Sequence, residues 1–231
     1  MSSKPYQLLV FDWDGTLMDS AARIVSCLRR AIADTGAEDR DESALRDIIG
    51  LGLDEAILAL YPRADHRFLA DFREAYRVHF LERDETPSML FPGVGETLAA
   101  LESAGYWLAV ATGKSRRGLD RVLHDTGLSR HFLASRCADE TFSKPNPAML
   151  NEIMNELGLG PRDTLMIGDS EYDMLMASNA GTDRLGVTYG VHGEQRLSQH
   201  GPVALMDDLR VLPRWLSGGG TLEPGSARQM P

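Results

Sequence analysis

A short apolar run that ends in two carboxylates constrains this chain more than any other stretch. Residues 8–11 (LLVF) are bounded by polar residues, which predicts a strand buried on both faces, as in a parallel sheet. Asp12 and Asp14 follow it, and side chains two positions apart on an extended backbone point the same way. Sites in open parallel sheets form at the carboxyl ends of the strands. The two acids therefore predict a functional site at the end of this first strand.

The rest of the chain alternates short apolar runs with helical patterns. Further strands are predicted near residues 106–111, 132–135, 164–168, 185–188 and 203–205. This alternation predicts an α/β fold, a Rossmann-like parallel sheet with helices on both faces. The segment 19–89 differs, because its apolar residues recur at helical spacing and it contains no predicted strand.

These patterns predict a discontinuous α/β core, residues 1–18 and 90–216, with an inserted all-helical cap, residues 19–89. The cap is expected at the carboxyl end of the sheet, above Asp12, where its two connections allow it to hinge as a lid. Residues 217–231 contain a triple glycine and few apolar residues, which predicts a flexible tail.

Composition excludes several classes of partner. The formal charge of −10 over 231 residues argues against a surface for nucleic acid or for an anionic membrane. We expect no signal peptide, because the first apolar run has only four residues and ends in two aspartates, and no segment approaches the ~18 apolar residues of a membrane span. Cys27 and Cys137 lack metal-binding or redox spacing, which favours a reducing cytoplasm. We expect a cytoplasmic protein, either a monomer or a homodimer.

Polar residues gather at four points of the predicted sheet edge. They are Asp12 and Asp14, then Thr112, Gly113 and Lys114, then Ser143 and Lys144, and finally Asp169 with Asp173 one turn further on. Carboxylates facing one pocket repel one another by roughly 1–4 kcal/mol per pair at 4 Å. A bound cation would relieve this repulsion, and hard oxygen ligands favour Mg²⁺. Lys144, Thr112 and Gly113 could then hold a phosphoryl group, and a carboxylate is a competent nucleophile toward phosphorus.

In its motif residues the chain resembles the haloacid dehalogenase superfamily, in particular its phosphoglycolate phosphatase-like branch with a helical cap. Four motifs carry the resemblance, DWDGT at 12–16, ATG at 111–113, KPNP at 144–147 and GDSEYD at 168–173. The resemblance implies a phosphatase acting on a small phosphorylated metabolite such as 2-phosphoglycolate, with an aspartyl-phosphate intermediate. Substrate specificity is expected in the cap loop of Gly50, Leu51 and Gly52.

The resemblance also implies a role for each motif residue. Asp12 is expected as the nucleophile and Asp14 as the general acid and base. The expected Mg²⁺ ligands are Asp169, the Asp12 carboxylate and the Asp14 carbonyl. The remaining roles are phosphate binding by Thr112, Gly113 and Lys144, and orientation of Lys144 or of the metal's waters by Asp173.

Simpler interpretations exist for some of these residues. Asp173 stands in the first turn of a predicted helix, where an acid can merely offset the helix dipole. Thr112 could be a strand-end hydroxyl without a role, and Lys114 is expected to be a solvated residue at a helix start. Glu171 and Tyr172 are near enough to matter, although the residues assign them no role.

Four other functions compete with the phosphatase. Dehalogenases of the superfamily lack an acid at the position of Asp14, and its phosphonate hydrolases need a cap lysine, which residues 20–88 do not contain. A sugar phosphomutase remains open, although the run from Gly50 to Glu55 has no arginine to hold a second phosphate. A non-catalytic binding protein on this fold would be expected to have lost Asp12, Asp14 or Lys144. All three are present.

Overall fold

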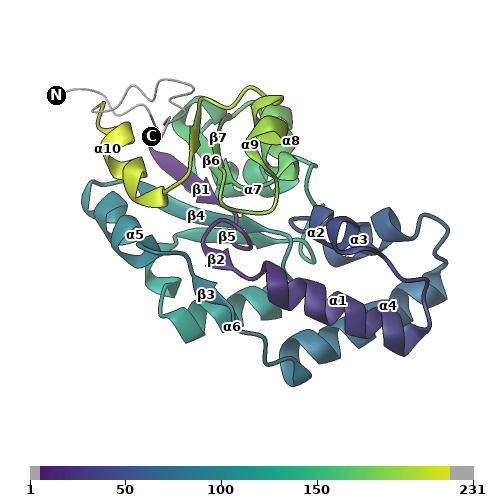
Figure 1. Ribbon diagram of the computed structural model, residues 1–231. Helices are drawn as coiled ribbons and strands as arrows, with labels where there is room; N and C mark the ends of the chain where they lie inside the picture. Colours follow the sequence, from purple (N-terminus) through teal and green to yellow (C-terminus); the bar gives the residue numbers. More distant parts are fainter. Residues whose placement is uncertain (1–5, 219–231) are drawn as a thin grey trace, which may run out of the picture.

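Six parallel strands form one sheet in the computed structural model, which describes residues 6–218 (Figure 1). Their order is β5-β4-β1-β6-β7-β8, so β1 lies inside the sheet between β4 and β6. The strands are β1 Leu8–Phe11, β4 Trp107–Thr112, β5 Ala134–Cys137, β6 Thr164–Gly168, β7 Asp183–Val187 and β8 Ala204–Met206. The predicted Rossmann-like parallel sheet is confirmed, with β4, β5, β7 and β8 shifted by one or two residues from the predicted runs.

The side chains of β1 alternate between two hydrophobic layers, and all four are fully buried. Leu9 and Phe11 face the layer formed with α5 (Val94–Ser103), α6 (Arg116–Thr126) and α10 (Leu212–Leu216). Leu8 and Val10 face the opposite layer, formed with α7 (Ala148–Leu157) and α8 (Glu171–Ala180). An apolar run without polar positions therefore fits a strand covered on both faces.

Four short helical elements complete the α/β part of the molecule. They are α9 (Glu194–Ser198) and the 3-10 turns η2 (Ser129–His131), η3 (Pro161–Asp163) and η4 (Leu209–Val211). Ser217 and Gly218 follow α10, and the rest of the predicted tail, 219–231, lies outside the described residues.

Residues 21–83, here called the helical segment, pack around a hydrophobic cluster of their own (Figure 1). The segment comprises α1 (Ala21–Thr35), α2 (Glu42–Asp47), α3 (Leu53–Leu60), α4 (His66–Val78) and the π-helical turn η1 (His79–Arg83). None of these residues lies in a strand, but the stretch predicted to be all-helical was longer, 19–89, and its end residues Asp19 and Met89 belong to strands. Two strands flank it and pair antiparallel, β2 (Met18–Asp19) and β3 (Met89–Leu90). The sequence did not predict this pair, because two residues are too few to show an alternating pattern.

Asp47, the last residue of α2, ties the helical segment to the α/β part. Its carbonyl oxygen accepts hydrogen bonds from the Tyr172 hydroxyl at 3.0 Å and from His192 Nε2 at 3.2 Å. Its carboxylate pairs with Arg196, which also binds Glu171 at 2.6 Å. Tyr172 and Glu171, left without a role by the sequence, therefore hold the end of α2 in place.

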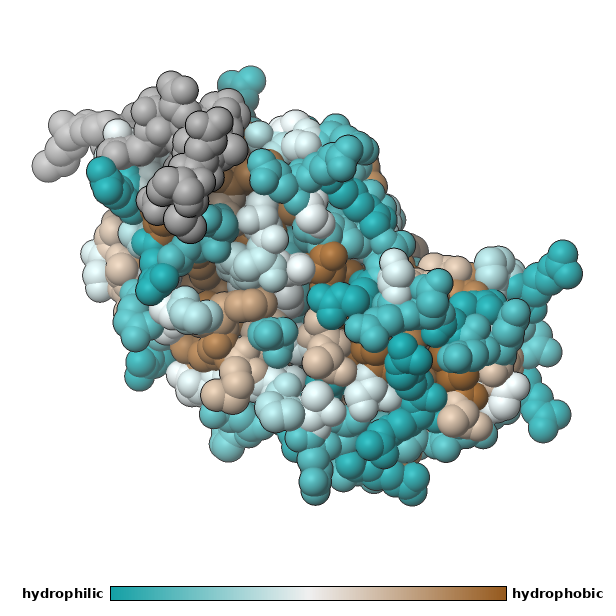
Figure 2. All heavy atoms as spheres, viewed as in Figure 1, coloured by the Kyte–Doolittle hydropathy of each residue, from teal (hydrophilic) through white to brown (hydrophobic). Residues whose placement is uncertain are grey.

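The surface agrees with the composition. Hydrophilic side chains cover much of the face shown in Figure 2, and they interrupt its hydrophobic areas. Across residues 6–218, every helix is too short or too polar to span a bilayer.

The buried imidazole of His192 predicts a pH dependence of stability. Its Nδ1 accepts from the Glu171 N–H at 2.9 Å, so Nε2 carries the hydrogen that Asp47 accepts. Burial, together with the nearby Arg196 charge, lowers the pKa of His192 below its ordinary 6.5. A group with a depressed folded-state pKa that is neutral when folded contributes stability above its unfolded pKa and loses it as the pH falls.

We therefore compare the change in the free energy of urea unfolding between pH 7.5 and pH 5.5 in wild type and in His192→Asn, whose side-chain oxygen can still accept from the Glu171 N–H but does not titrate. Buried acids with raised pKa values shift the stability of both proteins in the opposite direction, so the difference between the two proteins reports His192. Acidification should be less favourable to wild type than to His192→Asn, and equal changes in the two proteins would contradict this role.

Candidate active site

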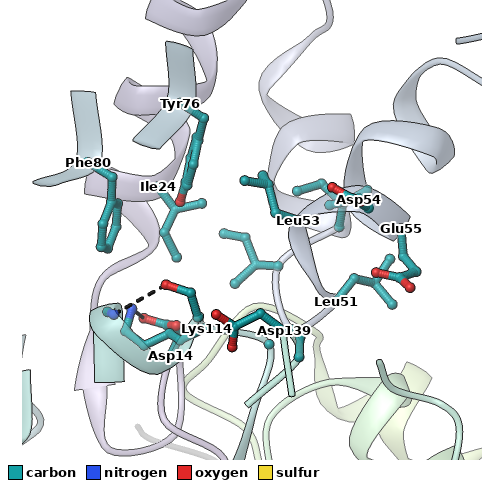
Figure 3. A pocket seen from close by; sticks show the side chains of 18 of the residues that line it. Asp14, Ile24, Leu51, Leu53, Asp54, Glu55, Tyr76, Phe80, Lys114 and Asp139 are labelled. Carbon is teal, nitrogen blue, oxygen red and sulfur yellow. Dashed lines mark hydrogen bonds and ion pairs between the residues drawn. The ribbon is translucent and has the colours of Figure 1, made fainter. Parts of the chain in front are cut away.

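Asp12 and Asp14 lie just beyond the carboxyl end of β1 and line a cavity of about 550 Å³ beneath the helical segment (Figure 3). The backbone turns at Gly15, which has φ +83°, a conformation that side chains with a Cβ rarely adopt. A Cβ at Gly15 would also lie 2.1 Å from Asp169 Oδ2. This turn therefore brings the first motif against the fourth.

Lys144 lies between two carboxylates beneath the cavity. Its Nζ is 2.7 Å from Asp12 Oδ1 and 2.7 Å from Asp173 Oδ1, and its side chain has no exposure. Asp12, Asp169 and Asp173 offer oxygens that all lie within 4.8 Å of one another. Three carboxylates and one ammonium group leave an excess of two negative charges in a volume from which solvent is excluded.

Burial and mutual repulsion raise the pKa of two of these acids. Burial raises the pKa of Asp12 well above its ordinary value, Lys144 opposes the shift, and Asp173 and Asp169 add to it. The pKa of Asp169 rises to about 7, through burial and the charge of Asp173. Burial lowers the pKa of Lys144, but the two carboxylates outweigh it and hold this pKa above the ordinary value. Lys144 therefore stays charged, and the acids need a further positive charge to ionise fully.

Asp14 is held apart from this cluster by two other donors. Its Oδ1 accepts from the Ser20 hydroxyl and from Lys114 Nζ at 2.7 Å. The prediction that Lys114 is solvated is wrong, since only 8% of the residue is exposed. Its ammonium group also lies 4.7 Å from the ring centroid of Phe80, in the helical segment. The local sequence gave no sign of this, because both partners are distant in the chain.

Thr112 ends β4 beside this site, and Gly113 follows it. Thr112 is fully buried, and its Oγ1 accepts from the Lys114 N–H at 3.2 Å, which leaves the hydroxyl hydrogen free to donate. Gly113 lines the cavity beside the loop of Gly50, Leu51 and Gly52, in which substrate specificity was predicted. A Cβ at Gly113 would meet the Leu51 carbonyl oxygen at 2.4 Å and that of Gly50 at 2.7 Å. Only glycine permits this close approach of the two backbones.

The three residues of the loop Gly50, Leu51 and Gly52 make different contacts. Gly50 and Leu51 line the cavity, whereas the Gly52 N–H donates to Ser143 Oγ at 2.7 Å. Ser143, which the sequence had placed only in the motif loop, thus fixes the position of this loop.

Asp173 contacts both the start of α8 and Lys144. Its Oδ2 accepts from Ser170 in a capping box at the start of α8, while Oδ1 faces Lys144. Asp169 is similarly fixed, accepting from Thr16 Oγ1 at 2.9 Å and from the Val191 N–H at 2.8 Å. No role was predicted for Ser170, Thr16 or Val191, because their contacts depend on the fold.

Comparison with known proteins supports this arrangement. Residues 9–187 match the family described as haloacid dehalogenase-like hydrolase. The chain is 39% identical over 206 residues to "Probable phosphatase IndB" of Dickeya dadantii, covering 87% of this chain and 89% of that one. It is 33% identical to a phosphoglycolate phosphatase of Vibrio vulnificus, covering 92% of this chain and 96% of the relative.

Solved structures of hydrolases and phosphatases have the same fold. A predicted phosphoglycolate phosphatase from Haemophilus somnus superposes with a TM-score of 0.81 at 26% identity, covering 93% of this chain and 99% of that one. A haloacid dehalogenase-like hydrolase from Bacteroides fragilis gives a TM-score of 0.84 at 27% identity, covering 90% and 99%. The motifs, the parallel sheet and these matches agree, and the chain belongs to the haloacid dehalogenase-like hydrolase family.

Proposed function

We propose that this protein is a Mg²⁺-dependent phosphatase that hydrolyses a small phosphate monoester through an aspartyl-phosphate on Asp12. The observation that carries the proposal is the Asp12 carboxylate itself. It lines the cavity, neither of its oxygens has an aligned hydrogen bond among the described residues, and Lys144 holds it by charge at 2.7 Å. Because some relatives are phosphoglycolate phosphatases, 2-phosphoglycolate is the compound against which other substrates should be compared in an assay.

In the proposed first step, an Asp12 oxygen attacks phosphorus and the bond from phosphorus to the ester oxygen breaks. Asp14 gives its proton to the departing alcohol. In the second step, Asp14 takes a proton from a water that attacks the phosphorus of the aspartyl-phosphate, which frees phosphate and regenerates Asp12. Because Ser20 and Lys114 both bind Oδ1, Oδ2 is the Asp14 oxygen left to carry this proton.

Three groups could hold the phosphoryl oxygens during these steps. Lys144 supplies a buried positive charge, and the Thr112 hydroxyl and the Gly113 N–H supply hydrogen bonds. Asp173 positions Lys144 through its second oxygen. A fixed ammonium group and oriented donors cost no reorganisation when charge develops on the phosphoryl group.

The buried acids fit a magnesium ion. We propose Asp12, Asp169 and the Asp14 carbonyl as ligands. Asp173 is assigned to Lys144 instead, because its Oδ1 faces that ammonium group, whereas Asp169 accepts only from the neutral donors Thr16 and the Val191 N–H. When bound, Mg²⁺ would neutralise the excess carboxylate charge and polarise the phosphoryl group.

The residues above the catalytic groups support a hydrolase over a sugar phosphomutase. A mutase needs free cations for a second phosphate. The two arginines that line the cavity are engaged, Arg73 with Asp54 at 2.6 Å and Arg77 with Glu74 at 2.6 Å.

We also propose that the helical segment acts as the cap, within the predicted boundaries 19–89. A reducing cytoplasm suits the two buried free cysteines.

Replacement of Asp12 tests the proposal most simply. We expect Asp12→Asn to lower the rate of phosphate release with Mg²⁺ below about one thousandth of wild type, because an amide is a poor nucleophile of nearly equal volume. Asp19→Asn serves as the matched control, since Asp19 is exposed and ends β2. Circular dichroism should show both variants folded. Substantial turnover by Asp12→Asn would rule out the proposed nucleophile.

Gly113→Ala tests the close approach between the two backbones. The added Cβ must displace the Leu51 carbonyl or the phosphate-binding turn, and a displacement of about 1 Å can cost about a hundredfold in rate. Gly95→Ala is the control, because a Cβ at this position in α5 meets nothing within 4 Å. We expect kcat/KM to fall about 10- to 100-fold in Gly113→Ala only. Equal activity in the two variants would contradict the argument.

A further inference from the structure

The cavity extends well beyond the catalytic groups. Asp12 and Gly113, which follow β1 and β4, line it together with Asp14 and Lys114, and we call these four residues its floor. Figure 3 shows Asp14 and Lys114 at the lower end of the cavity, which continues upward between α1, α3 and α4 of the helical segment. A volume of about 550 Å³ lies within the range of roughly 300–1,000 Å³ that accommodates drug-sized ligands. A phosphate group bound at the floor therefore leaves most of the upper cavity for the alcohol half of the ester.

Apolar side chains form much of the upper wall. Tyr76 and Phe80 lie on one side with their rings stacked, centroids 5.6 Å apart and planes at 19°. Leu51 and Leu53 lie on the other side (Figure 3). Ile24, Leu28, Ile48 and Ile49 add to the lining. A wall of this kind favours an apolar group that it can remove from water.

The charged residues of the upper cavity do not suit an anion. Arg73 makes a two-fold hydrogen bond to Asp54, at 2.7 and 2.6 Å, and Arg77 makes one to Glu74, at 2.8 and 2.6 Å. The carboxylates of Asp54, Glu55 and Asp139 also line the cavity. A second negative charge on the substrate would have to break an arginine pair or approach an acid.

Tyr76 provides one neutral donor. Among the described residues its hydroxyl has no hydrogen-bond partner, and it points toward the lower part of the cavity (Figure 3). Burial holds the pKa of Tyr76 well above its ordinary value, so the hydroxyl keeps its hydrogen. An uncharged oxygen or nitrogen on the substrate could accept it.

We infer that the substrate is a phosphate monoester of an uncharged alcohol with a large apolar part, such as a ring or a branched chain, and without a second anionic group. This inference rests on the proposed phosphatase activity and refines its substrate. The upper cavity binds the apolar part, while the phosphate lies at the floor. On this account, 2-phosphoglycolate is a poor substrate, because its carboxylate would enter an apolar and acidic space.

The test compares kcat/KM for benzyl phosphate, ethyl phosphate and 2-phosphoglycolate with the wild-type enzyme and Mg²⁺. Benzyl and ethyl alcohols are leaving groups of similar basicity, so their ratio reports binding of the apolar part. We expect benzyl phosphate to exceed ethyl phosphate by about tenfold or more, and 2-phosphoglycolate to rank no higher than ethyl phosphate.

Two leucines of α3 provide matched variants. Leu53→Asn places a polar group in the wall and should reduce the benzyl-to-ethyl ratio. Leu58→Asn changes an exposed leucine of the same helix, 40% accessible and outside the cavity, and should preserve that ratio. An unchanged ratio in Leu53→Asn would overturn the inference.

The outcomes separate the inference from the function on which it rests. A wild-type ratio near one, or a preference for 2-phosphoglycolate, overturns the inference and leaves the phosphatase intact. Release of phosphate from none of the three esters overturns the proposed function, and the inference with it.

Discussion

Four charged side chains are buried together at the carboxyl edge of the sheet, Lys144, Asp12, Asp169 and Asp173, and many of the contacts described above stabilise them. Moving a charge from water to the interior is costly unless partners compensate it. Lys144 compensates Asp12 and Asp173, Thr16 and the Val191 N–H bind Asp169, and Ser170 binds Asp173. The compensation is incomplete, because acids outnumber the ammonium group. This deficit makes the site suitable for a divalent cation and an anionic substrate together.

The fold meets this constraint with elements that are distant in sequence. Parallel pairing of β1 with β4 and β6 brings Asp12, Thr112 and Asp169 to one edge of the sheet. The helical segment then covers this edge, and its position is fixed by backbone contact at Gly113 and by the polar contacts of Asp47. The covering segment also gives the cavity its apolar upper wall. On the proposed function, the same segment would also select the alcohol.

The sequence predicted the features that depend on local patterns. The apolar run at 8–11 and the repeated strand-helix alternation were sufficient for the parallel sheet, and motif spacing was sufficient to nominate Asp12, Lys144 and Asp169. Lys114 was misassigned because its partner Asp14 is 100 residues away. The pair β2 and β3 is too short for any periodic pattern. Helical spacing also cannot separate apolar residues that only pack, such as Ile57, from those that line the cavity, such as Leu53.

The central claim is that the buried acids are completed by a divalent cation, and thermal unfolding under Mg²⁺ titration tests it most directly. Protein stripped of metal should show a midpoint that rises with Mg²⁺ at constant ionic strength, by a stabilisation of about 2.7 kcal/mol at a hundredfold excess over Kd. In a protein of this size that is a rise of roughly 5–10 °C. Asp169→Asn should lose most of this rise, since it removes a proposed ligand. A wild-type midpoint that does not respond to Mg²⁺, or an equal rise in Asp169→Asn, would contradict the account.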